Sequence, residues 1–63
     1  MQLTGEYIHY RNGNSYYPID TCLIQVDDNW EPAVIYTDAS SAKYCRSLAE
    51  FLSKFHPHVP LAQ

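Results

Sequence analysis

The N-terminal segment of residues 5–20 (GEYIHYRNGNSYYPID) constrains the fold more than any other part of the chain. It is rich in tyrosine and is interrupted by Asn12 and Gly13, a pair that tolerates the positive φ angles of a type I′ turn. Residues 6–11 and 15–19, on either side of this pair, are of types that favour strands. The sequence therefore predicts an N-terminal β-hairpin.

Each strand of this predicted hairpin carries its own structural expectation. Alternation along the first strand places Ile8 and Tyr10 on one face and Tyr7 and His9 on the other. We expect the first pair to pack inward and the second pair to be available for a binding site. In the second strand Pro18 lacks an N–H group, so this strand should form a free edge of the sheet or break at the proline.

Two further strands are predicted over residues 22–26 and 30–36, joined by a turn at residues 27–29, whose side chains can bond their own backbone. After a polar linker over residues 37–42, two interpretations compete. In one, a single helix runs from Asp38 to about His56. In the other, residues 43–46 form a fifth strand and a short helix begins at Ser47.

The second interpretation is favoured because Ser47 and Glu50 have the spacing of a capping box. An apolar stripe at helical spacing follows, formed by Leu48, Phe51, Leu52 and Phe55. Prolines at positions 57 and 60 should end the helix and leave residues 57–63 as a loose tail.

These elements predict a mainly β fold in a single domain that spans residues 1–63, with a structured core over about residues 5–56. We expect a small SH3-like barrel, or a bent antiparallel meander of about five strands, with a short C-terminal α-helix. A chain of 63 residues buries only about 60% of its unfolded surface, so nearly every large apolar residue is needed for the core.

The charge pattern argues against two classes of partner, nucleic acids bound without sequence preference and anionic membranes. The net charge is −3, and the four cations, Arg11, Lys43, Arg46 and Lys54, are scattered, which disfavours general nucleic-acid coating and attraction to anionic membranes. No apolar run approaches the ~20 residues of a membrane span, and no signal peptide is recognisable. Two cysteines are too few for a disulfide framework. We therefore expect a soluble, cytoplasmic protein with reduced thiols and no membrane partner.

Three segments together resemble a known group of sequences. The opening Gly5-x-Tyr7-x-His9-Tyr10-Arg11 with Gly13, the strand residues 34–36 (VIY) and the later residues 44–51 (YCRSLAEF) are similar, in order and spacing, to a small bacterial family of unknown function. That family opens on G-x-Y-x-H-Y-[KR]-G and closes on W-V-R-P-x-x-M-F. Here Asn12 is an additional residue, Ser47 replaces the proline, and the second turn is shorter. The resemblance supports a strand over residues 43–46 but implies no activity.

Several polar residues are candidates for chemistry, each with a structural alternative. His9 could titrate near neutrality, yet no nucleophile or partner is identifiable by spacing, so a hydrogen-bonding role is favoured. Arg46 could clamp a carboxylate or phosphate, or form a salt bridge to Glu50 or Glu6. A zinc site is disfavoured, because only His56 and His58 are close in sequence and the two cysteines suit small core positions: Cys22 and Cys45. We expect no metal and no cofactor.

The aromatic residues give the best functional signal, because six tyrosines, one tryptophan and two phenylalanines exceed what so small a core can hide. Tyr and Trp suit recognition surfaces, although aromatic pairs also stabilise small sheets. We therefore favour a non-catalytic binding or adaptor module that meets a protein partner. An accessory protein of bacterial or phage origin would fit the same size and charge. The predicted binding residues are Tyr7, His9, Tyr16, Tyr17, Trp30, Tyr36 and Arg46.

Two alternatives remain open. One is a single-stranded nucleic-acid-binding module that uses aromatic stacking together with Arg11 and Arg46. The other is a small enzyme or small-molecule site centred on His9. An edge strand near Tyr16 and Tyr17 would also be compatible with a homodimer.

Overall fold

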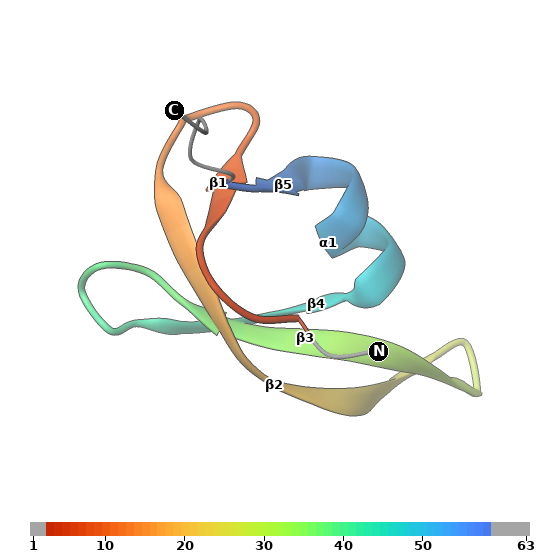
Figure 1. The fold of residues 1–63 in the computed structure, drawn as a ribbon. Helices are drawn as coiled ribbons and strands as arrows, with labels where there is room; N and C mark the ends of the chain where they lie inside the picture. Colours follow the sequence, from red (N-terminus) through yellow and green to blue (C-terminus); the bar gives the residue numbers. More distant parts are fainter. Residues whose placement is uncertain (1–2, 59–63) are drawn as a thin grey trace.

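The computed structural model describes residues 3–58 and contains one bent antiparallel sheet with a short helix (Figure 1). The strand order in the sheet is β4-β3-β2-β1-β5, and the sheet is not closed into a barrel. The bent-meander form of the prediction is therefore confirmed. The elements are β1 (Tyr7–His9), β2 (Ser15–Val26), β3 (Asn29–Thr37), β4 (Lys43–Ser47), α1 (Leu48–Lys54) and β5 (Phe55–Pro57).

The strands are distributed differently from the prediction. The two strands expected over residues 15–19 and 22–26 are one continuous strand, β2, and an additional strand, β5, follows the helix. β2 lies between β1 and β3 in the strand order, so the prediction that it forms the free edge of the sheet was wrong. β1 pairs only with Ser15 and Tyr16, however, so Pro18 itself is paired on the β3 side alone. The register shifts between Pro18 and Asp20, which leaves Ile19 as an extra residue in β2. A bulge is a place where a missing N–H group is tolerated and where a strand bends.

The first hairpin is present, but its turn is longer than predicted. The His9 N–H group donates to the Asn14 carbonyl oxygen (3.1 Å), and the Gly13 N–H group donates to the His9 carbonyl oxygen (2.9 Å). Four residues therefore form the loop, and among them only Gly13 has a positive φ angle, of 72°. The predicted type I′ turn was wrong, because the Asn12 side chain accepts from the Asn14 N–H group (2.8 Å) and forms its own local turn.

The second hairpin carries the tight two-residue turn. Asp27 and Asp28 have φ angles of 49° and 69°, the left-handed region that both central residues of a type I′ turn occupy. Val26 and Asn29 pair on either side of them. The predicted position of this turn is confirmed.

The C-terminal part follows the strand-plus-helix interpretation. β4 covers the predicted fifth strand, and Ser47 caps α1 by accepting from the Glu50 N–H group at 3.2 Å. The helix ends at Lys54, earlier than expected, because Phe55 has an extended backbone and begins β5. β5 pairs with β1, so Pro57 lies opposite Tyr7 in an edge strand, a position that tolerates proline. Of the predicted tail, residues 59–63 lie outside the described residues.

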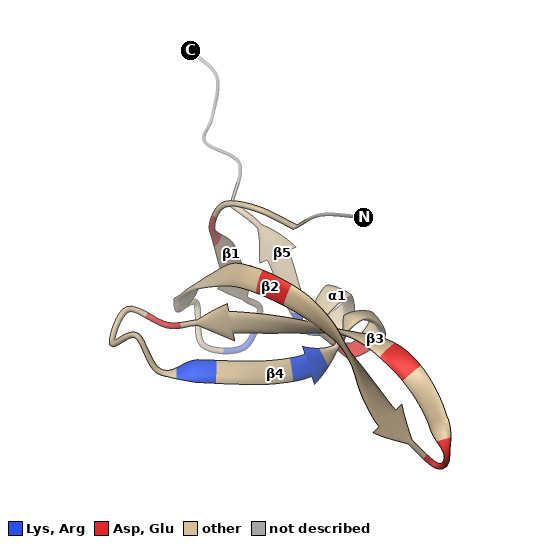
Figure 2. Ribbon diagram, turned by 90° about the horizontal axis from the view of Figure 1, so that it is seen from below, with Lys and Arg blue, Asp and Glu red and all other residues tan. Residues whose placement is uncertain are grey.

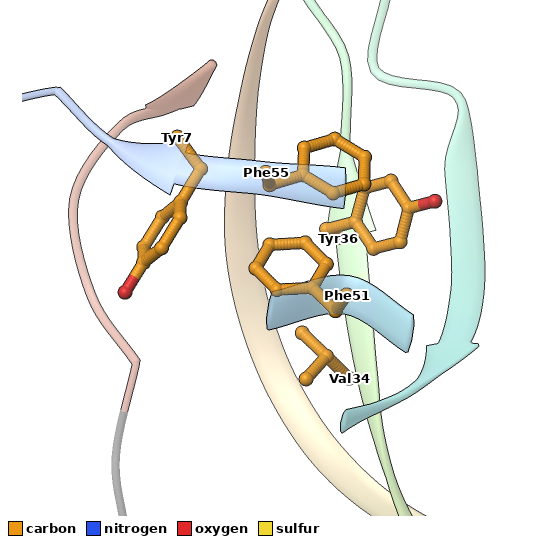
Figure 3. Packing of buried hydrophobic residues seen from close by; sticks show 5 residues of the cluster. All are labelled: Tyr7, Val34, Tyr36, Phe51 and Phe55. Carbon is orange, nitrogen blue, oxygen red and sulfur yellow. The ribbon is translucent and has the colours of Figure 1, made fainter. Parts of the chain in front are cut away.

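The core is mainly aromatic and lies inside the bend of the sheet, between the strands and α1 (Figure 3). Phe51 and Phe55 stack with ring centroids 4.4 Å apart, and Tyr7 lies 5.2 Å from Phe51. The predicted faces of β1 were therefore wrong. Tyr7 is only 8% exposed because α1 packs onto its face, whereas Tyr10 is 66% exposed because it lies in the loop beyond β1.

α1 has seven residues, and no helix in residues 3–58 is long and apolar enough to cross a membrane.

Candidate binding surfaces

An aromatic cavity opens at the bend of the sheet, and every strand contributes to it. It has a volume of about 190 Å³. This is below the roughly 300–1,000 Å³ of typical small-molecule sites, so it suits a small ligand or one side chain. The residues that line it, called the aromatic cavity below, are His9, Asn12, Tyr16, Tyr36, Tyr44, Arg46 and Phe55.

The rings of the aromatic cavity hold one another in place. Tyr16 meets Tyr36 and Phe55 nearly edge-on, with centroids 5.7 Å and 5.2 Å apart. Tyr36 and Tyr44 stack at 5.5 Å. Edge-to-face and offset-stacked pairs are the favoured aromatic geometries and add about 0.5–1.5 kcal/mol each beyond the area that they bury. These ring contacts restrict the side-chain conformations of the cavity walls.

Arg46 is tied into this wall by three contacts. Its Nε donates to the Tyr36 hydroxyl (2.9 Å), its Nη1 donates to Glu50 in an ion pair (2.7 Å), and its guanidinium carbon lies 5.9 Å from the centre of the Phe55 ring. The bond to Tyr36 is the main reason why the pKa of Arg46 is raised. The predicted salt bridge to Glu50 is therefore present, whereas Glu6 accepts a hydrogen bond from Ser15 instead.

His9 packs by its ring and is neutral near pH 7. The ring meets Phe55 edge-on with centroids 4.8 Å apart, and its Nδ1 accepts from the Arg11 N–H group at 3.1 Å. Desolvation, followed by the positive charges of Arg46, Lys54 and Arg11, holds the pKa of His9 below its usual value. With Nδ1 as an acceptor, the proton of the neutral ring is on Nε2. His9, which lines the cavity, can thus donate a hydrogen bond through Nε2, while the lone pair of Nδ1 is already used by the Arg11 N–H group.

Asp38 fixes the loop beside the aromatic cavity, a role that sequence reasoning missed. Its Oδ1 accepts from the N–H groups of Ser40 (2.8 Å) and Ala42 (3.1 Å), and its Oδ2 accepts from the Tyr44 hydroxyl (2.7 Å). The bond from Tyr44 is the main cause of a lowered pKa of Asp38 and a raised pKa of Tyr44. The signal was available, since Asp at the start of a loop of small polar residues is typical of such turns.

A second surface lies on the hairpin formed by β2 and β3. The strand register pairs Leu23 with Pro32 and Gln25 with Trp30, which places these residues on the same sheet face as the buried Val34. Leu23 and Trp30 are 63% and 64% exposed. We call Leu23, Trp30 and Pro32 the hairpin patch. A groove of about 310 Å³ leads from it toward α1, lined in part by Leu3 and Leu48.

The charge around the hairpin patch has one sign. Residues 22–32 contain three acidic and no basic residues, and Figure 2 shows this concentration at the projecting turn. The acidic residues are Asp27, Asp28 and Glu31.

The predicted binding residues do not form one surface. His9, Tyr16, Tyr36 and Arg46 come together in the aromatic cavity, while Tyr7 lies in the core. Tyr36 belongs to the same core cluster and is only 4% exposed, so the expectation that it is an exposed binding residue was wrong. Tyr17 and Trp30 are exposed and do not line the cavity. The cavity also contains Tyr44 and Phe55, which sequence reasoning did not select. Phe55 was assigned to a helix stripe, so its position in β5 could not be anticipated.

The zinc-ligand candidates are only partly associated. Cys22 and Cys45 lie side by side, with their sulfur atoms 4.0 Å apart. Neither is a core residue, contrary to the prediction, since Cys22 is half-buried and Cys45 is exposed. Among residues 3–58, no three potential metal ligands of the His, Cys, Asp or Glu type gather into a group.

No protein-family model, no curated protein and no solved structure matches the chain. The comparisons neither support nor oppose the resemblance to the small bacterial family, which stays a prediction.

Proposed function

We propose that the chain is a non-catalytic protein-binding module that engages its partner through the hairpin patch. The observation that supports this proposal is the exposure of Leu23 and Trp30 on a face that elsewhere forms the core. Large exposed apolar side chains that adjoin one another are typical of interaction sites, and tryptophan is enriched among the residues that dominate binding energy.

The surroundings of the patch restrict the chemistry of the partner. The acidic residues of the hairpin would attract a surface that carries Lys or Arg around an apolar centre. The groove toward Leu48 offers room for an apolar side chain of such a partner. We propose that this encounter takes place in the cytoplasm.

Substitution of Trp30 tests the proposal directly. The tagged full chain is used to capture partners, and the affinity of the captured protein for purified Trp30→Ser is compared with that for Tyr10→Ser. Tyr10 is a matched control, because it is equally exposed and lies outside the patch. We expect W30S to weaken binding at least about tenfold, the effect of losing a central aromatic contact, and Y10S to bind as the parent chain does. Equal binding by both variants would contradict the proposal.

Two other partners are distinguished in the same experiment. Sedimentation of the parent chain and W30S over a concentration series identifies a homodimer if only the parent chain self-associates. A fluorescent single-stranded oligonucleotide titrated at low salt tests the nucleic-acid alternative. Binding of the oligonucleotide that is lost in Arg11→Gln and Arg46→Gln, and retained in W30S, would replace the leading proposal.

A second candidate function is favoured by the aromatic cavity. His9 offers an Nε2–H donor and Arg46 a cation on the same small cavity, which suits a ligand with acceptor oxygen atoms. Acetate and inorganic phosphate are suitable probes, followed by nuclear magnetic resonance through the ring signals of Tyr16, Tyr36 and Tyr44, which line the cavity and remain when His9 is replaced. A saturable shift in the parent chain that is absent in His9→Phe supports the site. A shift that grows linearly with probe concentration, or that persists in H9F, would exclude it.

A further inference from the structure

The two cysteines form a pair at the surface of the sheet. Cys22 and Cys45 are both free thiols, and their sulfur atoms are 4.0 Å apart. Cys22 pairs with Ala33 and Cys45 pairs with Ile35, which are two residues apart and therefore lie on one face of β3. The thiols thus approach each other on the face opposite to the core residue Val34.

The topology opposes a disulfide between these cysteines. β3 lies between β2 and β4 (Figure 1), and strands of a sheet are about 4.8 Å apart, so residues two strands away are separated by about 9.6 Å between their Cα atoms. A disulfide requires a Cα separation of about 4.4–6.8 Å and a sulfur separation of about 2.05 Å. Closing the bond would require β2 or β4 to leave β3.

The same spacing fits two sulfur atoms that share one metal ion. With a metal–sulfur bond of about 2.3 Å, two thiolates on one ion are about 3.8 Å apart at a tetrahedral angle and about 4.6 Å apart when collinear. The observed 4.0 Å corresponds to an angle of about 120° at the ion, and an opening of the thiol pair by about 0.6 Å gives the near-linear arrangement that two-coordinate Cu(I) prefers. The side chains can therefore reach a common ion while the strands keep their pairing.

The number of ligands selects the ion. Thiolates favour soft ions such as Cu(I) and Zn²⁺. A structural zinc site takes four protein ligands, whereas Cu(I) is satisfied by two thiolates. The part of the chain that the structure describes gathers no third His, Cys, Asp or Glu around this pair. The half-buried and exposed positions of the two thiols leave them accessible from solvent.

We propose that Cys22 and Cys45 form a dithiolate clamp that binds one Cu(I) ion on the outer face of the sheet. Two S–H bonds break and two Cu–S bonds form, and both protons go to solvent, without any change of oxidation state. The clamp lies on the sheet face opposite to the hairpin patch and outside the aromatic cavity, and its Cys22 also borders the groove beside Leu23. It replaces the core role that the sequence suggested for the two cysteines.

The test titrates the reduced full chain with Cu(I) under anaerobic conditions, in competition with bicinchoninate as a coloured chelator. We expect a stoichiometry of one ion per chain, with release of two protons. Cys22→Ser and Cys45→Ser should each bind at least about 100-fold more weakly, because the second thiolate acts at a high effective concentration. Circular dichroism and Trp30 emission verify that both variants keep the fold.

A matched control keeps two thiols in the chain and separates them. In the double variant Cys45→Ser, Ser40→Cys, the new thiol lies in the loop that follows Thr37. Thr37 is itself about 13 Å along β3 from Ala33, the residue opposite Cys22. We expect the double variant to bind as weakly as C45S. Parent-like affinity in this variant or in either single variant would overturn the proposal. So would a Cys22–Cys45 disulfide that forms under mild oxidation while the circular dichroism of the fold is retained.

Discussion

The two ends of the β2–β3 ribbon use the same sheet face in opposite ways. Near Val34 this face is covered by α1 and β5, and Val34 and Phe51 are fully buried. The hairpin of β2 and β3 extends beyond the helix (Figure 2). Near Trp30, the same face carries large apolar side chains in contact with solvent. The difference arises from length, because a helix of seven residues, about 10 Å long, cannot cover strands of nine and twelve residues.

This comparison separates stability from recognition. The covered end contains the packed aromatic rings, so substitutions there should change the free energy of unfolding. The projecting end buries little, so substitutions there should change binding with little effect on stability.

Truncation of Phe51 should have the largest effect. Phe51→Ala removes a fully buried ring that stacks on Phe55, and we expect a loss of about 3–5 kcal/mol in the free energy of unfolding, measured by chemical denaturation. Leu52→Ala is the control on the same helix, because Leu52 is 46% exposed, and it should cost much less. If F51A does not fold, Phe51→Leu should still lose more stability than L52A. Equal losses from both positions would contradict the division.

Loss of the helix cap should have an intermediate effect. Ser47→Ala removes the oxygen atom that accepts from the Glu50 N–H group, and the typical cost of such a change is about 1 kcal/mol. Ser53→Ala is the matched control within the same helix, because the Ser53 hydroxyl only donates to a carbonyl group of the helix and caps no free N–H group. Thermal unfolding of both variants measures the difference. If S47A matches S53A in stability, the cap does not hold α1 over the core.

Protonation of His9 should weaken the covered end in acid. The pKa of His9 is lowered in the folded state, so the unfolded state binds more protons once the pH falls below the usual value of 6.5. The contribution of neutral His9 to the free energy of unfolding is therefore complete above pH 6.5 and is lost as the pH falls through the lower folded pKa. In His9→Phe this part of the pH dependence should disappear, whereas His56→Phe should retain it. If the free energy of unfolding of H9F falls in acid as it does in the parent chain, a titrating group other than His9 causes the effect.

The sequence predicted the strands and the helix better than it predicted which side chains are buried and which are exposed. Local signals were sufficient for the cap at Ser47, the turn at residues 27–29 and the fifth strand, because each depends on neighbouring residues. The long-range pairing of β5 with β1 had no local signal. This pairing accounts for the errors at Tyr7, which is buried beneath α1, and at Phe55, which belongs to a strand.

The aromatic cavity was predicted in part for the same reason. Composition indicated an excess of rings, the alternation of the first strand selected His9, and a position on predicted strands selected Tyr16 and Tyr36. Alternation could not tell which rings would meet, because the bulge after Pro18 changes the register of β2 relative to β3. The hairpin patch was missed except for Trp30, since its exposure depends on where α1 ends its cover of the sheet.

The smallest stability effect should occur at Trp30, and it is the sharpest test of the comparison. Its side chain is 64% exposed, and surface substitutions of this kind usually change the free energy of unfolding by no more than about 0.5 kcal/mol. Trp30→Ser should therefore unfold at the same denaturant concentration as the parent chain, followed by circular dichroism because the only tryptophan is removed. If the free energy of unfolding of W30S is unchanged, any loss of partner binding in this variant comes from the lost surface contact and not from unfolding. A loss as large as that of F51A would mean that the projecting hairpin is part of the core, and that its exposed face is not held ready for a partner.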